Sequence, residues 1–295
     1  MKFGIHVSIA GSVDKAVDRA KEKMCEAFQI FTRNPRGWKF EPLTRDEAAT
    51  FVQKLGDAEI GPAVAHMPYL PNLASPKDDV YKVSVETLTV ELERSGQLGI
   101  PYLVTHLGSH LGGGMAQGQE RIVEAVNLAL SKVENGVMLL LENTAGTKNS
   151  MGSTFEEVKH ILDRLERRDR VGVCFDTAHA FAAGYDLRDA ETVDKTLRDL
   201  DRVIGLERLK VVHANDSKGD LDSHIDRHEH IGLGYIGENG FKALLRRKEL
   251  EKLPFILETP VDRRRDDYGN LKKIRELAED RSPIRRRATL IPLKP

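Results

Sequence analysis

Six apolar segments of the sequence each end in a residue that can bind a metal ion. These residues are three histidines and three carboxylates, and they follow one another at intervals of 34 to 45 positions: His66, His106, Glu142, Asp176, His213 and Glu258. A hydrogen-bonded histidine or a helix-capping carboxylate would explain any one of them. Six in succession favour a metal cluster, because clustered carboxylates repel one another unless cations neutralise them.

Two neighbouring segments hold further candidate ligands. His179 follows Asp176 by three positions, and residues 222–230 contain two aspartates and three histidines: Asp222, Asp226, His224, His228 and His230. Composition leaves the choice among these three histidines open, and a charged, solvated loop is the alternative interpretation. All the donors are nitrogen or oxygen, which suits Zn²⁺, Mn²⁺ or Fe²⁺ better than Mg²⁺ or Ca²⁺. Eight or nine such side chains can hold two or three ions and would suit hydrolytic phosphoryl transfer.

The elements that position these residues alternate regularly along the chain. Eight short apolar runs predict parallel strands buried on both faces: Lys2–His6, Ala27–Thr32, Pro62–His66, Tyr102–His106, Val137–Glu142, Val171–Asp176, Lys210–His213 and Phe255–Glu258. Eight stretches with helical periodicity follow them: Ser12–Lys23, Thr44–Leu55, Lys77–Gln97, Gln119–Val133, Thr154–Glu166, Glu191–Val203, Asn239–Arg247 and Asp266–Ala278. Thr44 with Glu47, and Thr154 with Glu157, have the spacing of capping boxes.

Eight strand–helix alternations predict a single (β/α)₈ TIM barrel. The C-terminal ends of all its strands meet at one face, so the candidate ligands would converge there. An open doubly wound sheet is the alternative, but the sequence after the first predicted strand, His6-Val-Ser-Ile-Ala-Gly11, lacks its glycine-rich phosphate loop. We expect the barrel domain to cover residues 1–280 and residues 281–295 to form a basic tail.

The composition excludes a disordered chain and a membrane protein. The chain has 295 residues, of which 40% are hydrophobic and 31% charged. Its two cysteines, Cys25 and Cys174, provide neither a disulfide framework nor a cysteine-based zinc motif, so a cytoplasmic location is expected. The formal net charge is −1, but residues 281–295 carry five Lys and Arg and no acid, so the other residues sum to −1 − 5 = −6.

Seven motifs along the chain match the pattern of a known family. They are His66-Met-Pro-Tyr69-Leu70, Thr105-His106-Leu-Gly-Ser-His110, Leu141-Glu142-Asn143-Thr-Ala-Gly146, Val173-Cys-Phe-Asp176-Thr-Ala-His179-Ala-Phe-Ala-Ala-Gly-Tyr-Asp186, His213-Ala-Asn-Asp216-Ser-Lys218, Asp226-Arg-His228 and Ile256-Leu-Glu258-Thr259. In this order they resemble the endonuclease IV family, the zinc-dependent apurinic/apyrimidinic endonucleases of base-excision repair. The resemblance runs from Lys2 to about Thr259.

The resemblance implies a TIM barrel with three Zn²⁺ ions per chain and assigns their ligands. The first site corresponds to His66, His106 and Glu142. The second corresponds to Glu142 again, as a bridge, with Asp176, His213 and Glu258. The third corresponds to His179, Asp226 and His228. His224 and His230 are then not ligands.

The resemblance also implies the reaction and the partner. The reaction is hydrolysis of the phosphodiester on the 5′ side of an abasic site in double-stranded DNA, which leaves a 3′-hydroxyl and a 5′-deoxyribose phosphate. Glu142 and Glu258 would be the catalytic residues that orient a hydroxide held by zinc.

The expected DNA contacts correspond to Arg36, Tyr69 and Leu70, which the family inserts into bent DNA. Pro35 departs from the family, in which a polar residue is usual at this position. We expect a monomer that does not bind membranes. For the basic tail we favour a disordered end over a nonspecific phosphate contact.

A sugar isomerase or epimerase on a related barrel is the main alternative. Such enzymes use a four-residue divalent-metal set like Glu142, Asp176, His213 and Glu258. The five other candidates favour the nuclease, because an isomerase has no use for a third metal: His66, His106, His179, Asp226 and His228. The complete ligand set also argues against a non-catalytic DNA-binding barrel.

Overall fold

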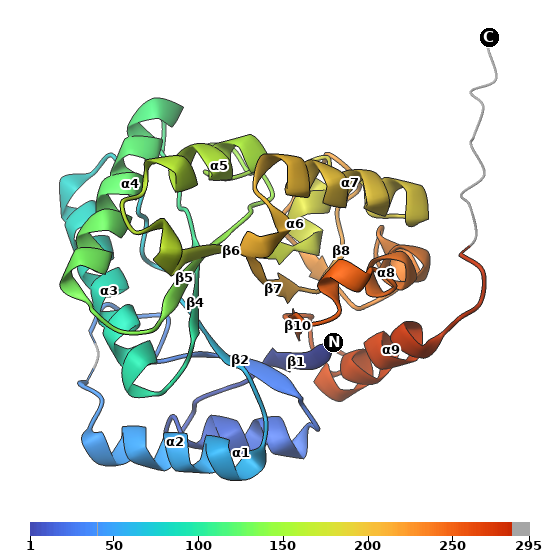
Figure 1. Ribbon diagram of the computed structural model, residues 1–295, viewed down its shortest axis with the longest axis horizontal. Helices are drawn as coiled ribbons and strands as arrows, with labels where there is room; N and C mark the ends of the chain where they lie inside the picture. Colours follow the sequence, from blue (N-terminus) through green and yellow to red (C-terminus); the bar gives the residue numbers. More distant parts are fainter. Residues whose placement is uncertain (40, 285–295) are drawn as a thin grey trace.

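Eight parallel strands close into a barrel, and the helices surround it (Figure 1). The structure is a computed structural model that describes residues 1–39 and 41–284. The barrel strands are β1 (Lys2–His6), β2 (Ala27–Phe31), β3 (Ala63–His66), β4 (Tyr102–His106), β5 (Met138–Glu142), β6 (Val171–Asp176), β7 (Leu209–His213) and β10 (Pro254–Leu257). β10 pairs with β1 and closes the sheet, so the predicted (β/α)₈ barrel is confirmed. Most of the predicted basic tail, residues 285–295, lies outside the described residues.

The helices include one short segment that the sequence did not predict. The helices are α1 (Lys15–Glu22), α2 (Arg45–Ala58), α3 (Asp78–Gln97), α4 (Met115–Lys132), α5 (Phe155–Arg164), α6 (Thr177–Ala182), α7 (Ala190–Val203), α8 (Gly237–Leu245) and α9 (Asp267–Glu279). The six residues of α6 are too few to show a helical period. This helix forms directly after β6 because the Asp176 side chain accepts a hydrogen bond from the His179 backbone N–H.

The loop after β7 contains a second unpredicted feature. The two-residue strands β8 (Asp216–Ser217) and β9 (His228–Glu229) pair antiparallel within it. Strands this short leave no alternation to read from the sequence. Their pairing folds the loop back, so that Asp226 and His228 return toward the end of the barrel.

One of the two predicted capping boxes is complete and the other is half formed. Thr44 and Glu47 exchange both hydrogen bonds at the start of α2. At the start of α5, Thr154 accepts from the Glu157 backbone N–H. The Glu157 carboxylate does not return the bond to Thr154, because it accepts from the backbone N–H groups of Gly152 and Ser153 instead.

The barrel interior is filled in layers, because successive side chains of a strand point to opposite faces. One layer consists of fully buried apolar side chains: Ala27, Val64, Val104, Leu140, Cys174, Val211 and Ile256. Two positions after each of these stands a polar residue: Gln29, His66, His106, Glu142, Asp176, His213 and Glu258. His6 of β1 is in register with Gln29 and completes this polar layer. The layer therefore lies at the C-terminal ends of the strands.

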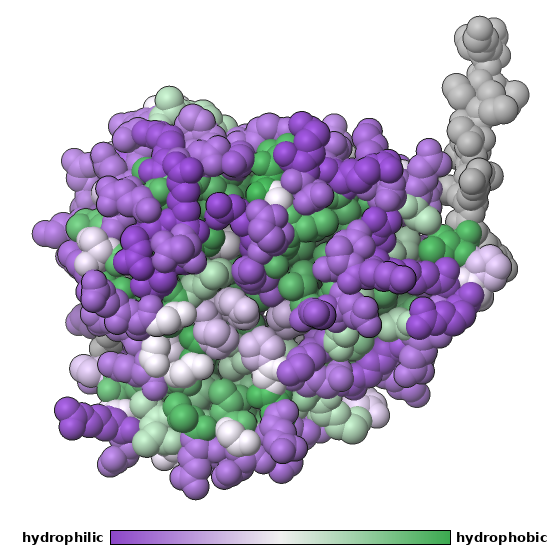
Figure 2. Space-filling view, in the orientation of Figure 1, coloured by the Kyte–Doolittle hydropathy of each residue, from purple (hydrophilic) through white to green (hydrophobic). Residues whose placement is uncertain are grey.

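The outer surface of the molecule is mostly hydrophilic. Figure 2 shows hydrophilic side chains over most of the outline, where the helices lie, and hydrophobic ones mainly toward the middle of the face. Among the described residues, no helix is both long and apolar enough to cross a membrane.

Candidate metal centre

The polar layer, together with His179 of α6 and His228 of β9, brings eight predicted ligands together in three overlapping groups. Within each group the donor atoms lie within 4.8 Å of one another. The first group is His66, His106 and Glu142, and the second is Glu142, Asp176, His213 and Glu258. The third group is Asp176, His179 and His228. Eight of the nine predicted ligands thus form one connected cluster, and their assignment to metal ions stays a prediction.

Glu142 links the first two groups, as expected of a bridging carboxylate. Its Oε2 lies 3.1 Å from Nε2 of His66 and 3.0 Å from Nε2 of His106. Its Oε1 lies 2.9 Å from Nδ1 of His213 and 3.5 Å from Nδ1 of His179. The side chain is fully buried, so each oxygen faces imidazoles rather than water.

The ninth predicted ligand, Asp226, lies at the edge of the cluster. Its Oδ1 is 3.0 Å from Nε2 of His179, and its side chain is half exposed. The third group contains Asp176 in the place where the resemblance implied Asp226. Both carboxylates contact His179, so the third group has an aspartate beside His179 whether Asp176 or Asp226 is counted as its member.

Two observations indicate that these residues fit divalent cations. Burial alone would raise the pKa of Glu142, but the neighbouring imidazoles of His106 and His213 lower it well below its usual range. Burial likewise opposes protonation of His179, but Asp176 and Asp226 raise its pKa well above its usual range. Positive charge therefore stabilises the buried carboxylates, and a divalent cation beside them would supply it.

The second observation is a buried nitrogen. Nε2 of His228 is buried and has no hydrogen-bond partner among the described residues. It lies 3.7 Å from the Asp176 carboxylate, a separation too long for a hydrogen bond. A cation beside it would satisfy this nitrogen and neutralise the carboxylate, and imidazole with carboxylate is a donor set that suits zinc.

Three of the imidazoles are oriented by backbone carbonyl groups. Nδ1 of His66 donates to the carbonyl oxygen of Met67 at 2.8 Å. Nδ1 of His179 donates to the carbonyl oxygen of Asn143 at 3.0 Å, and Nδ1 of His228 donates to that of Glu258 at 3.0 Å. A carbonyl oxygen only accepts, so Nδ1 carries the proton. Nε2 of each ring is left to face the cluster as a potential ligand atom.

Two asparagines that the sequence analysis did not select position Asp176. Asn143 accepts from the Asp176 backbone N–H at 2.8 Å, and Asn215 donates to Asp176 Oδ2 at 2.7 Å. Asn215 also accepts from the Glu258 backbone N–H at 2.7 Å. Both lie one or two positions after a candidate ligand, a signal that was available, but an amide is not itself a typical ligand.

Asp216 anchors the loop that carries Asp226 and His228. Its buried carboxylate accepts hydrogen bonds from five backbone N–H groups of the loop, those of Ser217, Gly232, Gly234, Ile236 and Gly237. These groups lie on both sides of the candidate ligands in the sequence. One carboxylate therefore holds both ends of the loop in place.

The remaining histidines of this loop have structural contacts. Nδ1 of His224 lies 3.1 Å from the carbonyl oxygen of Ala145. His230 is fully buried, and its ring nitrogens contact Asp262 at 3.0 Å and Asn270 at 2.9 Å. Neither residue belongs to the three groups of potential ligands.

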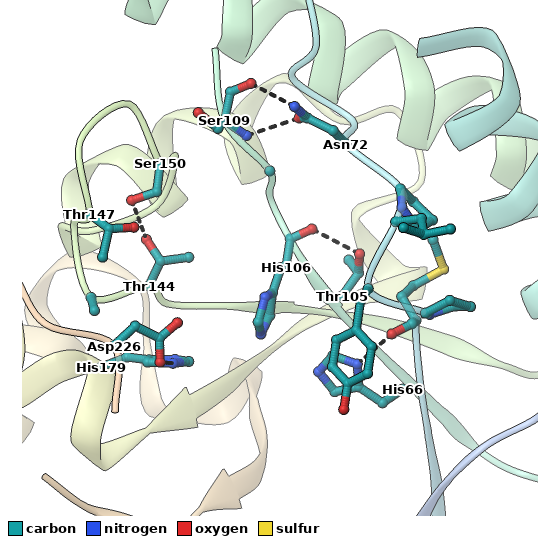
Figure 3. Close-up of a pocket in the computed structure, with 17 residues that line it drawn as sticks. His66, Asn72, Thr105, His106, Ser109, Thr144, Thr147, Ser150, His179 and Asp226 are labelled. Carbon is teal, nitrogen blue, oxygen red and sulfur yellow. Dashed lines mark hydrogen bonds and ion pairs between the residues drawn. The ribbon is translucent and has the colours of Figure 1, made fainter. Parts of the chain in front are cut away.

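A cavity of about 290 Å³ opens beside the cluster (Figure 3). His66, His106, His179 and Asp226 line one side of it. Small hydroxyl and amide side chains also line it: Asn72, Ser109, Thr144, Thr147 and Ser150. The cavity thus places potential metal ligands beside groups that are able to hydrogen-bond to a polar molecule.

The residues expected to contact DNA lie near this cavity. Tyr69 and Leu70 line it and are 68% and 39% exposed. The Tyr69 ring packs against Phe31 at 5.0 Å between centroids. Arg36 is exposed on the neighbouring loop after β2.

A buried ion pair fixes the loop that carries Arg36. Glu91 of α3 is fully buried and accepts from Arg33 Nε at 2.6 Å and from Thr32 Oγ1 at 2.7 Å. Arg94 donates to the carbonyl oxygens of Thr32 at 2.6 Å and Glu41 at 3.2 Å. These bonds hold both ends of the loop against α3. No pattern in the sequence marks them, because a glutamate and an arginine in a long helix usually face solvent.

Comparisons with known proteins show which family the chain belongs to. The family described as "Xylose isomerase-like TIM barrel" matches residues 17–281. "Probable endonuclease 4" of Methanoculleus marisnigri is 58% identical over 276 residues, which cover 93% of this chain and 98% of that relative. The crystal structure of endonuclease IV from Thermus thermophilus superimposes with a TM-score of 0.84 at 38% identity, covering 95% of this chain and 99% of that one.

A D-tagatose 3-epimerase-like protein also superimposes, with a TM-score of 0.71 over 94% of this chain and 95% of that one. Its identity is only 23%, so this likeness shows the shared barrel alone. The relatives with high identity along nearly their whole length decide the family. The chain belongs to the endonuclease IV family and is a nuclease of the hydrolase class.

Proposed function

We propose that this enzyme hydrolyses the phosphodiester on the 5′ side of abasic sites in double-stranded DNA. The products would be a 3′-hydroxyl and a 5′-deoxyribose phosphate, and three zinc ions per chain would be the cofactors. The observation that carries the proposal is the connected cluster of five imidazoles and three carboxylates at one end of the barrel of an endonuclease IV family member. Asp226 borders this cluster and would be the ninth ligand.

The proposed ligand sets follow the three groups. His66, His106 and Glu142 would hold one ion, and Glu142, Asp176, His213 and Glu258 a second. His179 and His228, with Asp226 or Asp176, would hold the third. Bound zinc would supply Lewis acidity that activates water and neutralises phosphate oxygens.

The two proposed catalytic carboxylates differ in their access to solvent. Glu142 is fully buried and faces four imidazoles, which suits it to keep the cluster together. The Glu258 side chain is 22% exposed, so it is the carboxylate that an attacking water molecule reaches directly. We therefore assign to Glu258 the orientation of this water and the acceptance of a hydrogen bond from it.

The proposed DNA contacts are Arg36, Tyr69 and Leu70. Tyr69 and Leu70 are exposed where they line the cavity, and Arg36 is exposed on the loop after β2, which supports insertion into the duplex at the damaged position, where no base pair opposes opening. The hydroxyl groups that line the cavity would then hydrogen-bond to the sugar and phosphate. A monomeric state and a cytoplasmic location stay predictions from the sequence.

The test uses a duplex with one abasic site and a matched duplex with an intact base at that position. The zinc-loaded enzyme should cleave only the first, on the 5′ side of the site, and a chelator should stop it. Elemental analysis should find about three zinc ions per chain. A single Mg²⁺ or Mn²⁺, with epimerisation of a ketose and no cleavage, would instead establish the isomerase alternative.

A further inference from the structure

The polar layer of the barrel contains one member that is neither a histidine nor a carboxylate. Its eight positions, one from each strand, are His6, Gln29, His66, His106, Glu142, Asp176, His213 and Glu258. Gln29 of β2 is fully buried among these ionisable groups. A buried amide is stable only when its hydrogen-bonding groups find partners, so its contacts indicate what it does there.

Gln29 contacts three members of the layer. Its Nε2 lies 2.7 Å from Oε1 of Glu258 and 3.1 Å from Nδ1 of His6. Its Oε1 lies 2.8 Å from Nε2 of His213. Both hydrogens of the amide nitrogen and one lone pair of the oxygen are therefore used within the layer.

These contacts determine which nitrogen of the neutral His213 ring carries the proton. The Glu258 carboxylate only accepts hydrogen bonds, so the amide nitrogen of Gln29 must face it and the amide oxygen must face His213. That oxygen accepts, so Nε2 of His213 donates and keeps its proton. Nδ1 of His213 is then the nitrogen left for a cation, and it lies 2.9 Å from Glu142 and 3.3 Å from Glu258.

We infer that Gln29 is a positioning residue for the second metal site, which it serves by orienting His213 and Glu258 at the same time. This inference rests on the proposed function, since it assumes that these two residues bind metal. Gln29 holds the His213 ring so that Nδ1 points toward the cluster. It also holds Oε1 of Glu258, so that Oε2 of Glu258 faces the cluster. Outer hydrogen-bond partners of this kind commonly change metal affinity by about 10- to 100-fold.

The decisive variant is Gln29→Met, which keeps the length of the side chain and removes all three hydrogen bonds. Ile30→Val is the matched control, because Ile30 is equally buried on the same strand but belongs to the core outside the polar layer. Zinc per chain is measured after dialysis against a graded series of chelator concentrations. We expect Gln29→Met to lose one of its ions at a chelator concentration about 10- to 100-fold lower than wild type and Ile30→Val.

Two further readouts separate positioning from general destabilisation. In the zinc-loaded protein, NMR should detect the proton on His213 Nε2 in wild type and in Ile30→Val, because a buried acceptor slows its exchange. This signal should be lost in Gln29→Met. Steady-state kinetics on an abasic duplex should show a lower kcat with an unchanged KM, since Gln29 is buried and does not reach DNA. Thermal unfolding of the zinc-free variants checks that each one folds.

The outcomes are distinct. Wild-type zinc retention in a folded Gln29→Met variant would overturn the inference and leave the proposed function intact. Where Gln29→Met does not fold, the NMR signal in wild type decides, because a proton on Nδ1 rather than Nε2 of zinc-loaded His213 contradicts the inference. A wild-type enzyme that holds no zinc and cleaves no abasic duplex would overturn the proposed function itself.

Discussion

The buried ion pair between Glu91 and Arg33 links the stability of the barrel to the loop that carries Arg36. We consider Glu91→Gln, which keeps the shape of the side chain and removes its charge. The substitution leaves the Arg33 guanidinium buried, 3% exposed, without its carboxylate at 2.6 Å. Breaking a buried pair from one side typically destabilises a protein by about 3–5 kcal/mol.

The direction of the pKa shift of Glu91 indicates where in this range the loss of unfolding free energy should fall. Burial raises the pKa more than the hydrogen bonds from Thr32 and Arg33 lower it. The desolvation of this carboxylate is therefore only partly offset, and its removal relieves that cost. We expect the free energy of unfolding to fall by about 3 kcal/mol, the lower end of the range.

The assay is urea unfolding at saturating zinc, together with steady-state kinetics on an abasic duplex. The control is Asp18→Asn, because the Asp18–Lys54 pair is solvent-exposed and screened by water, so its loss should change the urea midpoint much less. In Glu91→Gln the KM should rise about tenfold, which equals about 1.4 kcal/mol of binding, as the loop loosens. The kcat should not change, because the ligands come from other elements. Equal urea midpoints for the two variants, or a fall in kcat alone, would refute this reasoning.

Three further predictions concern the site directly. Glu142→Gln should lower kcat by more than about 100-fold, since even loss of an outer-shell partner costs up to that much; near-normal turnover on an abasic duplex would exclude the bridging role. Tyr69→Ala combined with Leu70→Ala should raise KM at unchanged zinc content, because unstacking a base step costs a few kcal/mol that these side chains would no longer offset; an unchanged KM in a gel-based cleavage assay would contradict insertion. Asp216→Asn places an amide among five N–H donors and should release the third zinc first, visible as about two ions per chain by elemental analysis; retention of all three would show that the loop does not depend on this anchor.

The sequence predicted the barrel and the six potential ligands that gather at its strand ends, because both depend on local, repeated signals. Each strand is a short apolar run. Because side chains two positions apart point to the same face, each polar residue follows an apolar interior residue of its strand by two positions. His66 and Glu142 therefore stand out in the sequence before any contact is known. The same reasoning placed the strand boundaries within one residue, although Glu258 lies one position beyond β10.

The sequence did not predict the contacts between elements. Gln29, Asn143 and Asn215 contact partners 23 to 229 positions away, so the sequence does not show which residues they orient. In the sequence Glu91 looks like an ordinary charged residue of a helix. Its role as a buried partner of Arg33 is visible only in the structure, where the loop after β2 lies over α3. For the same reason the sequence could not show whether Asp226 or Asp176 lies in the third group with His179. The answer depends on how the loop after β7 folds back.

The closure of the sheet between β1 and β10 has a consequence for how the enzyme matures on the ribosome. The first group of potential ligands comes from the neighbouring strands β3, β4 and β5, so all its residues are present in the chain once residue 142 has been synthesised. The second group must wait for Glu258, which follows the very strand that seals the barrel. A nascent chain that pauses before this point would present a partly formed metal site on an open sheet edge. Full loading with metal would thus report that translation of the barrel has finished.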